Sequence, residues 1–179
     1  MPDGPFGELG ARLNPLSYAR LEAAFGEKGT GQGAFQNLRQ LAPAPDGTVF
    51  TVENETGRIQ HFDAQGKFIN LWFVPGTANL DEVYLDDITV GPDGKVYALT
   101  RGEIYVYDGS SGTLLTTLQP SAGEERLRVT TLAFGPDGTP YAMTGDETLL
   151  RFDAAWQPEI LAQEIPPHQP HPGMGPSGG

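Results

Sequence analysis

The chain has 179 residues, 23 acidic against 11 basic side chains, a formal net charge of −12 and no cysteine. This length allows one domain with a buried core. A surface of this sign repels nucleic-acid phosphates and anionic lipid headgroups, so we expect no nucleic-acid partner and no membrane insertion. The lack of cysteine excludes disulfides, thiolate metal sites and cysteine nucleophiles.

Residues 1–34 permit two readings. The stretch YARLEAAFG (18–26) stands before a glycine-rich segment in the same way that FINLWFV (68–74) stands before the next one, which indicates the outer strand of a partial repeat. The apolar spacing in LSYARLEAAF instead fits an N-terminal arm or a short helix. The first residues carry neither the basic nor the apolar region of a signal peptide, so the sequence predicts a soluble chain in the cytoplasm.

From residue 35 onward, one pattern occurs three times. Each copy has a Pro-Asp-Gly turn, centred on Asp46, Asp93 and Asp137, and then an aromatic-Asp pair 45 residues from its counterpart, at Phe62, Tyr107 and Phe152. Periods of about 40 to 50 residues built from short strands are typical of β-propeller blades. The repeat therefore predicts a propeller rather than a helical solenoid.

Each copy contains four apolar runs that predict strands. The runs are 39–44, 48–53, 58–64 and 68–74; 87–91, 95–100, 103–108 and 114–119; and 131–135, 139–144, 148–153 and 159–165. We therefore expect an all-β fold of propeller blades, each of four antiparallel strands, at about 35–80, 81–125 and 126–165. Three full blades and a possible partial one make half of a six-bladed ring.

The repeated aspartates have a structural explanation. In Pro-Asp-Gly the proline presets its φ, the aspartate bonds nearby backbone and the glycine accepts a positive φ, so two flanking apolar runs form a hairpin. We interpret these aspartates as turn residues rather than catalytic ones. His61, beside Phe62 on a predicted strand, is interpreted as packed rather than catalytic.

The end of the chain, 166–179, is dominated by proline and glycine. Such a segment cannot pack a core, and we expect a disordered tail. His168 and His171 lie in it without a third ligand, so a polar linker is favoured over a metal site.

Residues 25–72, FGEKGTGQGAFQNLRQLAPAPDGTVFTVENETGRIQHFDAQGKFINLW, closely resemble an NHL repeat. The resemblance lies in the glycine-rich loop that starts with Phe-Gly, the Pro-x-Gly turn and the Arg-Ile-Gln element. The two later copies keep DITVGPDGKVYALT and TLAFGPDGTPYAMT but lose Arg-Ile-Gln, and they look like more generic blades. The resemblance implies a propeller, typically six-bladed, that binds other macromolecules on the faces of the disc.

The strongest candidate for chemistry is the stretch LDEVYLDDITV. Asp86 and Asp87 directly precede a predicted inner strand, where a propeller presents residues to its central channel. Six-bladed lactonases of the gluconolactonase type hold a divalent metal there, and Asp86, Asp87, Glu53 and Asn54 are oxygen donors suited to calcium. Acidic residues at strand entrances are also ordinary turn residues, and no hydrolase, phosphate-loop or zinc motif occurs in the sequence.

We therefore favour a non-catalytic NHL-like propeller module for protein-protein binding or assembly, with no catalytic residue and no cofactor. The alternative is a divalent-metal-dependent hydrolase or lactonase that uses calcium. Propellers close with about four to eight blades, so we expect another chain to complete the ring, preferably a second copy. A different protein, or a degenerate fourth blade from 1–34, are the competing solutions.

Overall fold

The structure is a computed structural model that describes residues 27–53, 56–75 and 85–164. All regular secondary structure in these ranges is β-strand, which confirms the predicted all-β class. Within the same ranges, no helix has the length and apolar character needed for a membrane span. Most of 1–34 and the whole of 166–179 lie outside the described residues, so both readings of the first segment and the expected tail stay predictions.

Three four-stranded antiparallel sheets follow one another along the chain. The first blade consists of β3 (Leu38–Pro43), β4 (Val49–Glu53), β5 (Arg58–Phe62) and β6 (Phe68–Phe73). The second consists of β7 (Asp87–Val90), β8 (Val96–Thr100), β9 (Glu103–Tyr107) and β10 (Leu114–Leu118). The third consists of β13 (Val129–Phe134), β14 (Pro140–Thr144), β15 (Leu149–Phe152) and β16 (Pro158–Ala162). Every predicted strand overlaps one of these twelve, so the expected four-stranded blades are confirmed.

Two small sheets were not predicted. Strands β1 (Glu27–Lys28) and β2 (Ala34–Phe35) pair in parallel before the first blade. Strands β11 (Ser121–Ala122) and β12 (Glu125–Arg126) form a short hairpin between the second and third blades. Runs of two residues carry too little apolar periodicity to be read from the sequence.

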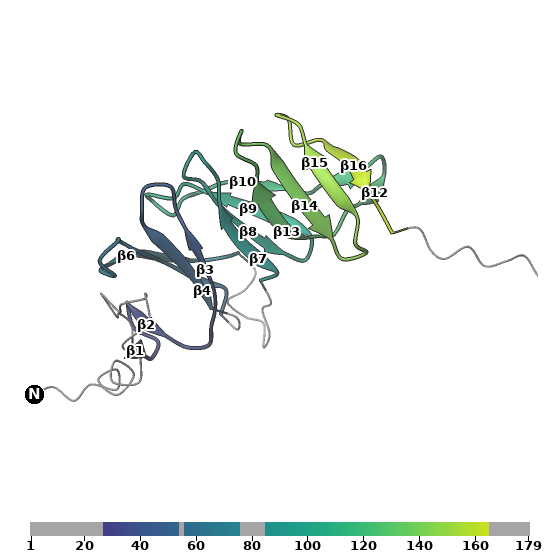
Figure 1. Cartoon of the computed structure of the whole chain (residues 1–179). Coiled ribbons are helices and arrows are strands. Elements are labelled where there is room, and N and C mark those ends of the chain that lie inside the picture. Colours follow the sequence, from purple (N-terminus) through teal and green to yellow (C-terminus); the bar gives the residue numbers. More distant parts are fainter. Residues whose placement is uncertain (1–26, 54–55, 76–84, 165–179) are drawn as a thin grey trace, which may run out of the picture.

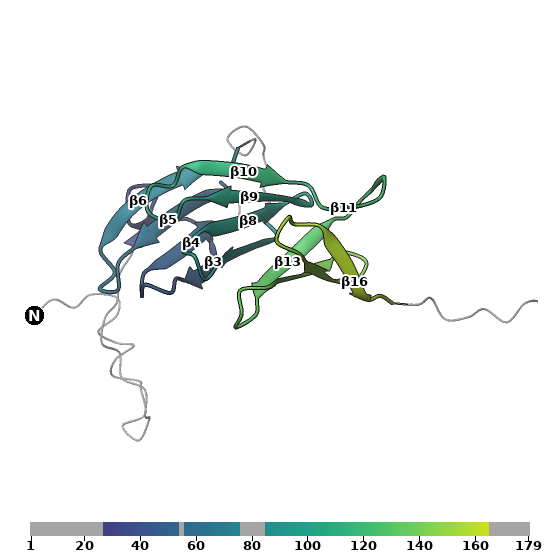
Figure 2. The ribbon, with the colours of Figure 1, turned by 90° about the horizontal axis from the view of Figure 1, so that it is seen from above.

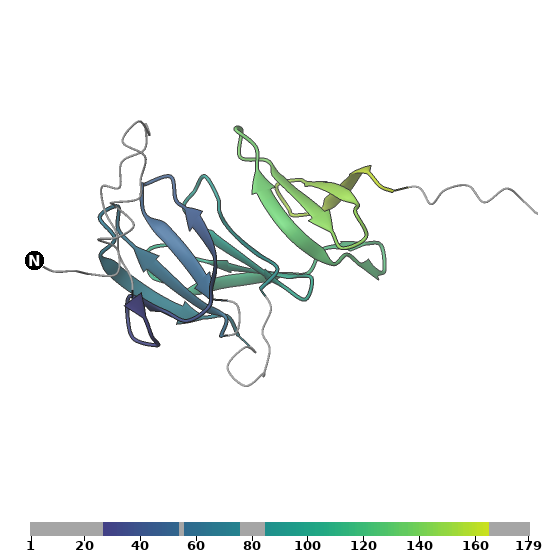
Figure 3. The same ribbon diagram turned by 60° about the horizontal axis from the view of Figure 1, so that its bottom comes forward.

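The blades form an open arc in which the first strand of each sheet is innermost. Strand β7 lies between β3 and β13 and contacts both of them (Figure 1). Seen from above, β3 and β13 lie toward the inside of the arc, and β6 and β10 follow its outer edge (Figure 2). A third view places the first and third blades at opposite ends (Figure 3). This arrangement is that of neighbouring propeller blades around a central axis.

Each blade has two faces, which we name by their neighbours. The trailing face points toward the following blade in the sequence, and the leading face points toward the preceding one. At the first junction, trailing Phe50, Val52 and Ile59 share one buried cluster with leading Ile88 and Ala98. All five residues of β8 in the second blade are buried, so both faces of this strand are covered, which explains why its apolar residues do not alternate strictly with polar ones.

The second junction repeats the first. Trailing Tyr97, Leu99 and Ile104 share a buried cluster with leading Leu132 and Leu150. In each blade, the Pro-Asp-Gly turn joins the first strand to the second, and these two strands pair in the same register. Residues at the same distance from this turn are therefore structurally equivalent in the three blades. Two successive blade junctions thus use the same positions and apolar chemistry.

Candidate functional site

The predicted channel carboxylate Asp87 connects all three blades. Its Oδ1 accepts a hydrogen bond of 2.6 Å from Gln40 Nε2 on β3, and its Oδ2 accepts one of 3.0 Å from the Leu132 backbone N–H on β13. The side chain is buried. Both carboxylate oxygens are therefore engaged in holding the inner strands together. This is a structural use of a residue that the sequence offered as a calcium ligand only in the alternative, enzymatic interpretation.

Asp86 lies beside this connection and is held differently. Its backbone N–H donates to the Leu99 carbonyl at 2.7 Å. Burial raises the pKa of the Asp86 carboxyl above its ordinary value, while the charge of Arg128, a hydrogen bond from the Arg101 backbone and the charge of Arg39 oppose that rise. One of its oxygens, Oδ2, is buried without a hydrogen-bond partner. Asp86 is thus the carboxylate of the predicted set with an unused acceptor.

Glu53 forms a buried ion pair with Arg58. Its Oε1 lies 2.5 Å from Arg58 Nη2, and both side chains are almost fully buried. Glu53 Oε1 also accepts from the Gln36 backbone N–H at 2.8 Å, and Oε2 accepts from Arg58 Nε and the Thr56 hydroxyl at 3.0 Å each. Both oxygens of Glu53 are therefore occupied at the turn between β4 and β5.

The same arginine fastens the glycine-rich segment 29–36 to the leading face of the first blade. Arg58 donates to the Thr30 carbonyl at 2.6 Å and to the Ala34 carbonyl at 2.8 Å. Gln60 exchanges hydrogen bonds of 2.9 Å with the Gly33 N–H and the Ala34 carbonyl. The glycine-rich loop and the Arg-Ile-Gln element, two parts of the sequence resemblance, thus bind each other.

These contacts bear on the predicted calcium site. Within the described ranges, no group of three or more histidine, aspartate or glutamate side chains is arranged to hold a metal ion. Glu53 belongs to the Arg58 network, whereas Asp87 bonds the inner strands, so the structure does not bring them into one ligand set. Asn54 lies outside the described residues.

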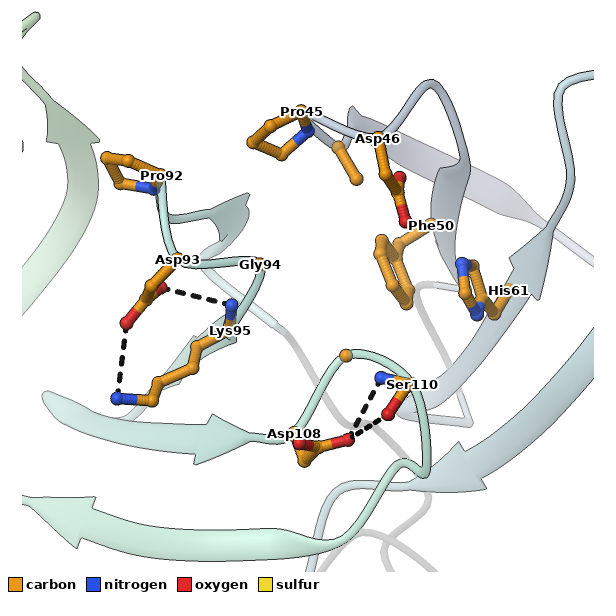
Figure 4. Close-up of a pocket in the computed structure, with 12 residues that line it drawn as sticks. Pro45, Asp46, Phe50, His61, Pro92, Asp93, Gly94, Lys95, Asp108 and Ser110 are labelled. Atoms are coloured by element: carbon orange, nitrogen blue, oxygen red, sulfur yellow. Dashed lines mark hydrogen bonds and ion pairs between the residues drawn. The ribbon is translucent and has the colours of Figure 1, made fainter.

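A cavity of about 420 Å³ opens between the turns of the first and second blades (Figure 4). Three aspartates line it, and each caps its own turn: Asp46 accepts from the Thr48 N–H at 2.9 Å, Asp93 from the Lys95 N–H at 3.1 Å, and Asp108 from the Ser110 N–H at 3.0 Å. Hydrogen bonds led by the Ser110 hydroxyl lower the pKa of Asp108 to about 2. The prediction that the repeated aspartates are turn residues is confirmed here.

His61 lies at the inner wall of this cavity and is packed, as expected. Its ring stacks on Phe50 with centroids 4.0 Å apart, and its Nε2 lies 2.7 Å from the Thr48 hydroxyl. Burial lowers the pKa of His61 below the ordinary value of 6.5, and the charge of Asp46 opposes this. Burial of the ring therefore favours its uncharged form.

The two end faces of the arc are the remaining feature. On the trailing face of the third blade, Tyr141, Met143 and Leu149 are only half-buried. On the leading face of the first blade, Leu41 is 59% exposed. The exposed residues on both end faces stand at repeat positions whose counterparts are buried at the internal junctions. Aligning the three repeats position by position would have identified these residues from the sequence.

Sequence reasoning missed two structural contacts, one between the inner strands and one between Arg58 and the glycine-rich segment. Gln40, Asp87 and Thr131 share one repeat position on the inner strands, and this shared polar position was a signal for contact between blades. The binding of Arg58 to the glycine-rich segment carries no such signal, because it depends on how 29–36 folds back over β5.

No family model matches the sequence, and no curated protein matches it. Among solved structures, the chain is similar to the dihydro-heme d1 dehydrogenase NirN in complex with DHE, with 18% identity and a TM-score of 0.56 over 73% of this chain and 29% of that one. It is similar to virginiamycin B lyase from Staphylococcus aureus, with 16% identity and a TM-score of 0.55 over 72% and 42% of the two chains.

A streptogramin B lyase is similar to the same extent, with 14% identity and a TM-score of 0.53 over 69% of this chain and 40% of the lyase. The chain spans less than half the length of each of these three proteins. The neighbours include enzymes, and at these identities they show the fold alone. The chain has the β-propeller fold, and its likeness to an NHL repeat is confined to the sequence of the first blade.

Proposed function

We propose that the chain is a non-catalytic propeller module that binds other proteins through the open faces of its end blades. The observation that carries this proposal is the trailing face of the third blade. Tyr141 and Met143 stand at the repeat positions of Tyr97 and Leu99, which are buried at the second junction, yet they are partly open to solvent. Apolar side chains grouped on an exposed face mark interaction surfaces.

The use of the polar groups supports the same proposal. Asp87 bonds the inner strands, and Glu53 neutralises Arg58. Carboxylates that are already hydrogen-bonded on both oxygens offer little to a substrate or a metal ion unless the structure rearranges. Binding through a surface needs no such rearrangement.

The alternative is a calcium-dependent hydrolase, and one observation favours it. The buried Oδ2 of Asp86 has no hydrogen-bond partner at the entrance of the inner strand β7. Titration of the chain with calcium in a calorimeter tests this alternative. We expect no saturable heat of binding, and one-to-one binding that disappears in Asp86→Ala would replace the binding proposal with the enzyme.

The binding proposal itself is tested by cross-linking. Benzoylphenylalanine replaces Met143 in cells that produce the chain, and a matched variant carries it at Leu115, an exposed leucine on the outer strand of the second blade. We expect an ultraviolet-dependent covalent adduct with a protein from position 143 and none from position 115. Equal yields from both positions, or no adduct from either, would contradict the proposal.

A further inference from the structure

We propose that the protein bound at the trailing face of the third blade is a second copy of this chain, which presents the leading face of its first blade. Two arcs joined in this way at both ends make one ring of six blades. The inference rests on the proposed function, because it names the partner of the same face. The two junctions within the chain and the chemistry of its two ends support this pairing.

The internal junctions show what a trailing face packs against. Val52 is buried against the cluster that contains Ile88, and Leu99 is buried in the cluster that contains Leu132. In both cases, an aliphatic residue on the second strand of one blade meets an aliphatic residue on the inner strand of the next. A trailing face is thus covered by the leading face of another blade, twice in the same chain.

The open trailing face has the composition of the covered ones. Met143 stands at the repeat position of Val52 and Leu99, and Leu149 stands at that of Ile59 and Ile104. Arg151 and Glu159 are cross-strand partners on this face, and their charged side chains pair at 2.6 Å. The pair lies toward the outer strand, where an ion pair at the rim of an interface keeps its contact with water.

On the leading face of the first blade, the part formed by the inner strand β3 is open in a complementary way. Leu41 on β3 stands at the repeat position of Ile88 and Leu132, which are 2% and 3% exposed, whereas Leu41 is 59% exposed. The glycine-rich segment covers Gln60 on β5 and leaves this inner part of the face open. The inner part is also where neighbouring blades meet within the chain, through β3, β7 and β13.

The end faces indicate how two copies of the chain are arranged in the dimer. A contact between two trailing faces would leave both leading faces open, and a contact between two leading faces would leave both trailing faces open. A trailing face against a leading face, repeated by a twofold axis, covers all four ends at once. It gives six blades from two described sets of three, a number within the range of about four to eight in which propellers close.

Light scattering on gel-filtered protein tests the inference first. We expect the unmodified chain to have twice the chain mass at micromolar concentration. Leu41→Glu and Met143→Arg each alter both contacts of a symmetric pair, and each is expected to weaken dimerisation by about tenfold or more, as for a central interface residue. Leu115→Arg changes a leucine of similar exposure away from both end faces and should leave the dimer intact.

Mixing the two variants tests the head-to-tail arrangement. A pair that contains one Leu41→Glu chain and one Met143→Arg chain has one unaltered contact and one contact between opposite charges. We expect the mixture to dimerise more tightly than either variant alone. Failure of the mixture to recover, while the unmodified chain is a dimer, would overturn the head-to-tail arrangement.

A cross-link in the folded chain covers the case in which a variant folds poorly. The chain has no cysteine, so Leu41→Cys with Met143→Cys introduces one pair of thiols. Packed sheets lie about 10 Å apart, a distance that a short bismaleimide spans and a disulfide does not. We expect a covalent dimer from this variant and none from Leu115→Cys with Met143→Cys.

The outcomes separate the two proposals. A monomeric, uncross-linked chain whose benzoylphenylalanine at position 143 still joins a different protein would overturn the second-copy inference and leave the binding function standing. A monomer that also yields no adduct from position 143 would overturn both. A dimer that Leu115→Arg disrupts as much as Met143→Arg does would place the contact on the outer strands instead.

Discussion

The first and third blades occupy equivalent places in the repeat but differ in how they are covered. All five residues of β5 in the first blade are buried, although the strand carries Arg58, Gln60 and His61. Strand β15 of the third blade is more apolar, yet half-buried and buried residues alternate along it. Burial in this arc therefore follows from what lies on each face of a strand. Strand β5 has the second blade on one side and the glycine-rich segment on the other, whereas β15 has a neighbour on one side among the described residues.

The two blades also contain two ion pairs of similar length in different surroundings. Arg58 and Glu53 lie 2.5 Å apart and are almost fully buried, and Arg151 and Glu159 lie 2.6 Å apart with both side chains largely exposed. For the Arg58–Glu53 pair, several hydrogen bonds to the backbone take the place of the water lost on burial. The Arg151–Glu159 pair stays hydrated, so water and salt screen the attraction between its charges.

The largest effect is expected from breaking the buried pair. Glu53→Ala leaves the Arg58 guanidinium buried without its counter-charge and removes the acceptor of the Gln36 N–H, so we expect a loss of about 3 to 5 kcal/mol in the free energy of unfolding. Glu159→Ala, the matched change in the third blade, should change it by less than about 0.5 kcal/mol. Urea denaturation of the three proteins measures both values.

A small loss in Glu53→Ala would mean that Arg58 is stabilised by the backbone carbonyls of Thr30 and Ala34 alone. Limited proteolysis adds a second readout, because release of the glycine-rich segment exposes its backbone to cleavage. We expect faster cleavage within 29–36 in Glu53→Ala and an unchanged rate in Glu159→Ala.

The channel offers a comparison of two adjacent carboxylates. Asp87→Ala removes the acceptor of the Leu132 N–H and of the Gln40 amide, and we expect a loss of about 2 kcal/mol, because the Gln40 side chain can turn toward water and the buried N–H cannot. Asp86→Asn should lower the free energy of unfolding by less than Asp87→Ala does, because its buried Oδ2 has no hydrogen-bond partner to lose and asparagine keeps an acceptor oxygen for the Arg101 backbone. Equal losses in the two variants, measured by urea denaturation, would contradict the roles assigned to them.

The sequence predicted the twelve strands because each hairpin carries its own local signal. A Pro-Asp-Gly turn or an aromatic-Asp pair specifies a chain reversal without reference to the rest of the fold. The roles of Glu53 and Asp87 were not predictable in this way, since an acidic residue beside a strand looks the same whether it binds a metal, an arginine or a backbone amide. The partner of Glu53 is five residues away, but the network that buries the pair depends on a segment that folds back from 29–36.

The smallest effect concerns His61, whose repeat positions in the other blades hold Val106 and Arg151. Burial lowers the pKa of His61 below 6.5, so the folded chain binds its proton at a lower pH than the unfolded chain does. The unfolded state then holds more protons below about pH 6.5, and the free energy of unfolding falls as the pH falls from there through the lowered pKa of the folded state. His61→Val places at this position the residue type that the second blade has there, and it removes the dependence of stability on the protonation of His61. We expect the free energy of unfolding of the unmodified chain to drop more than that of the variant between about pH 7.5 and about pH 5.5, as measured by urea denaturation at both values.

The variant also loses the ring contact with Phe50 and the hydrogen bond to Thr48, which lowers its stability at every pH, so the difference between the two pH values is the readout. Parallel profiles would mean that His61 titrates in the folded chain as it does in the unfolded one, and the stacked ring at the cavity wall would then be open to water.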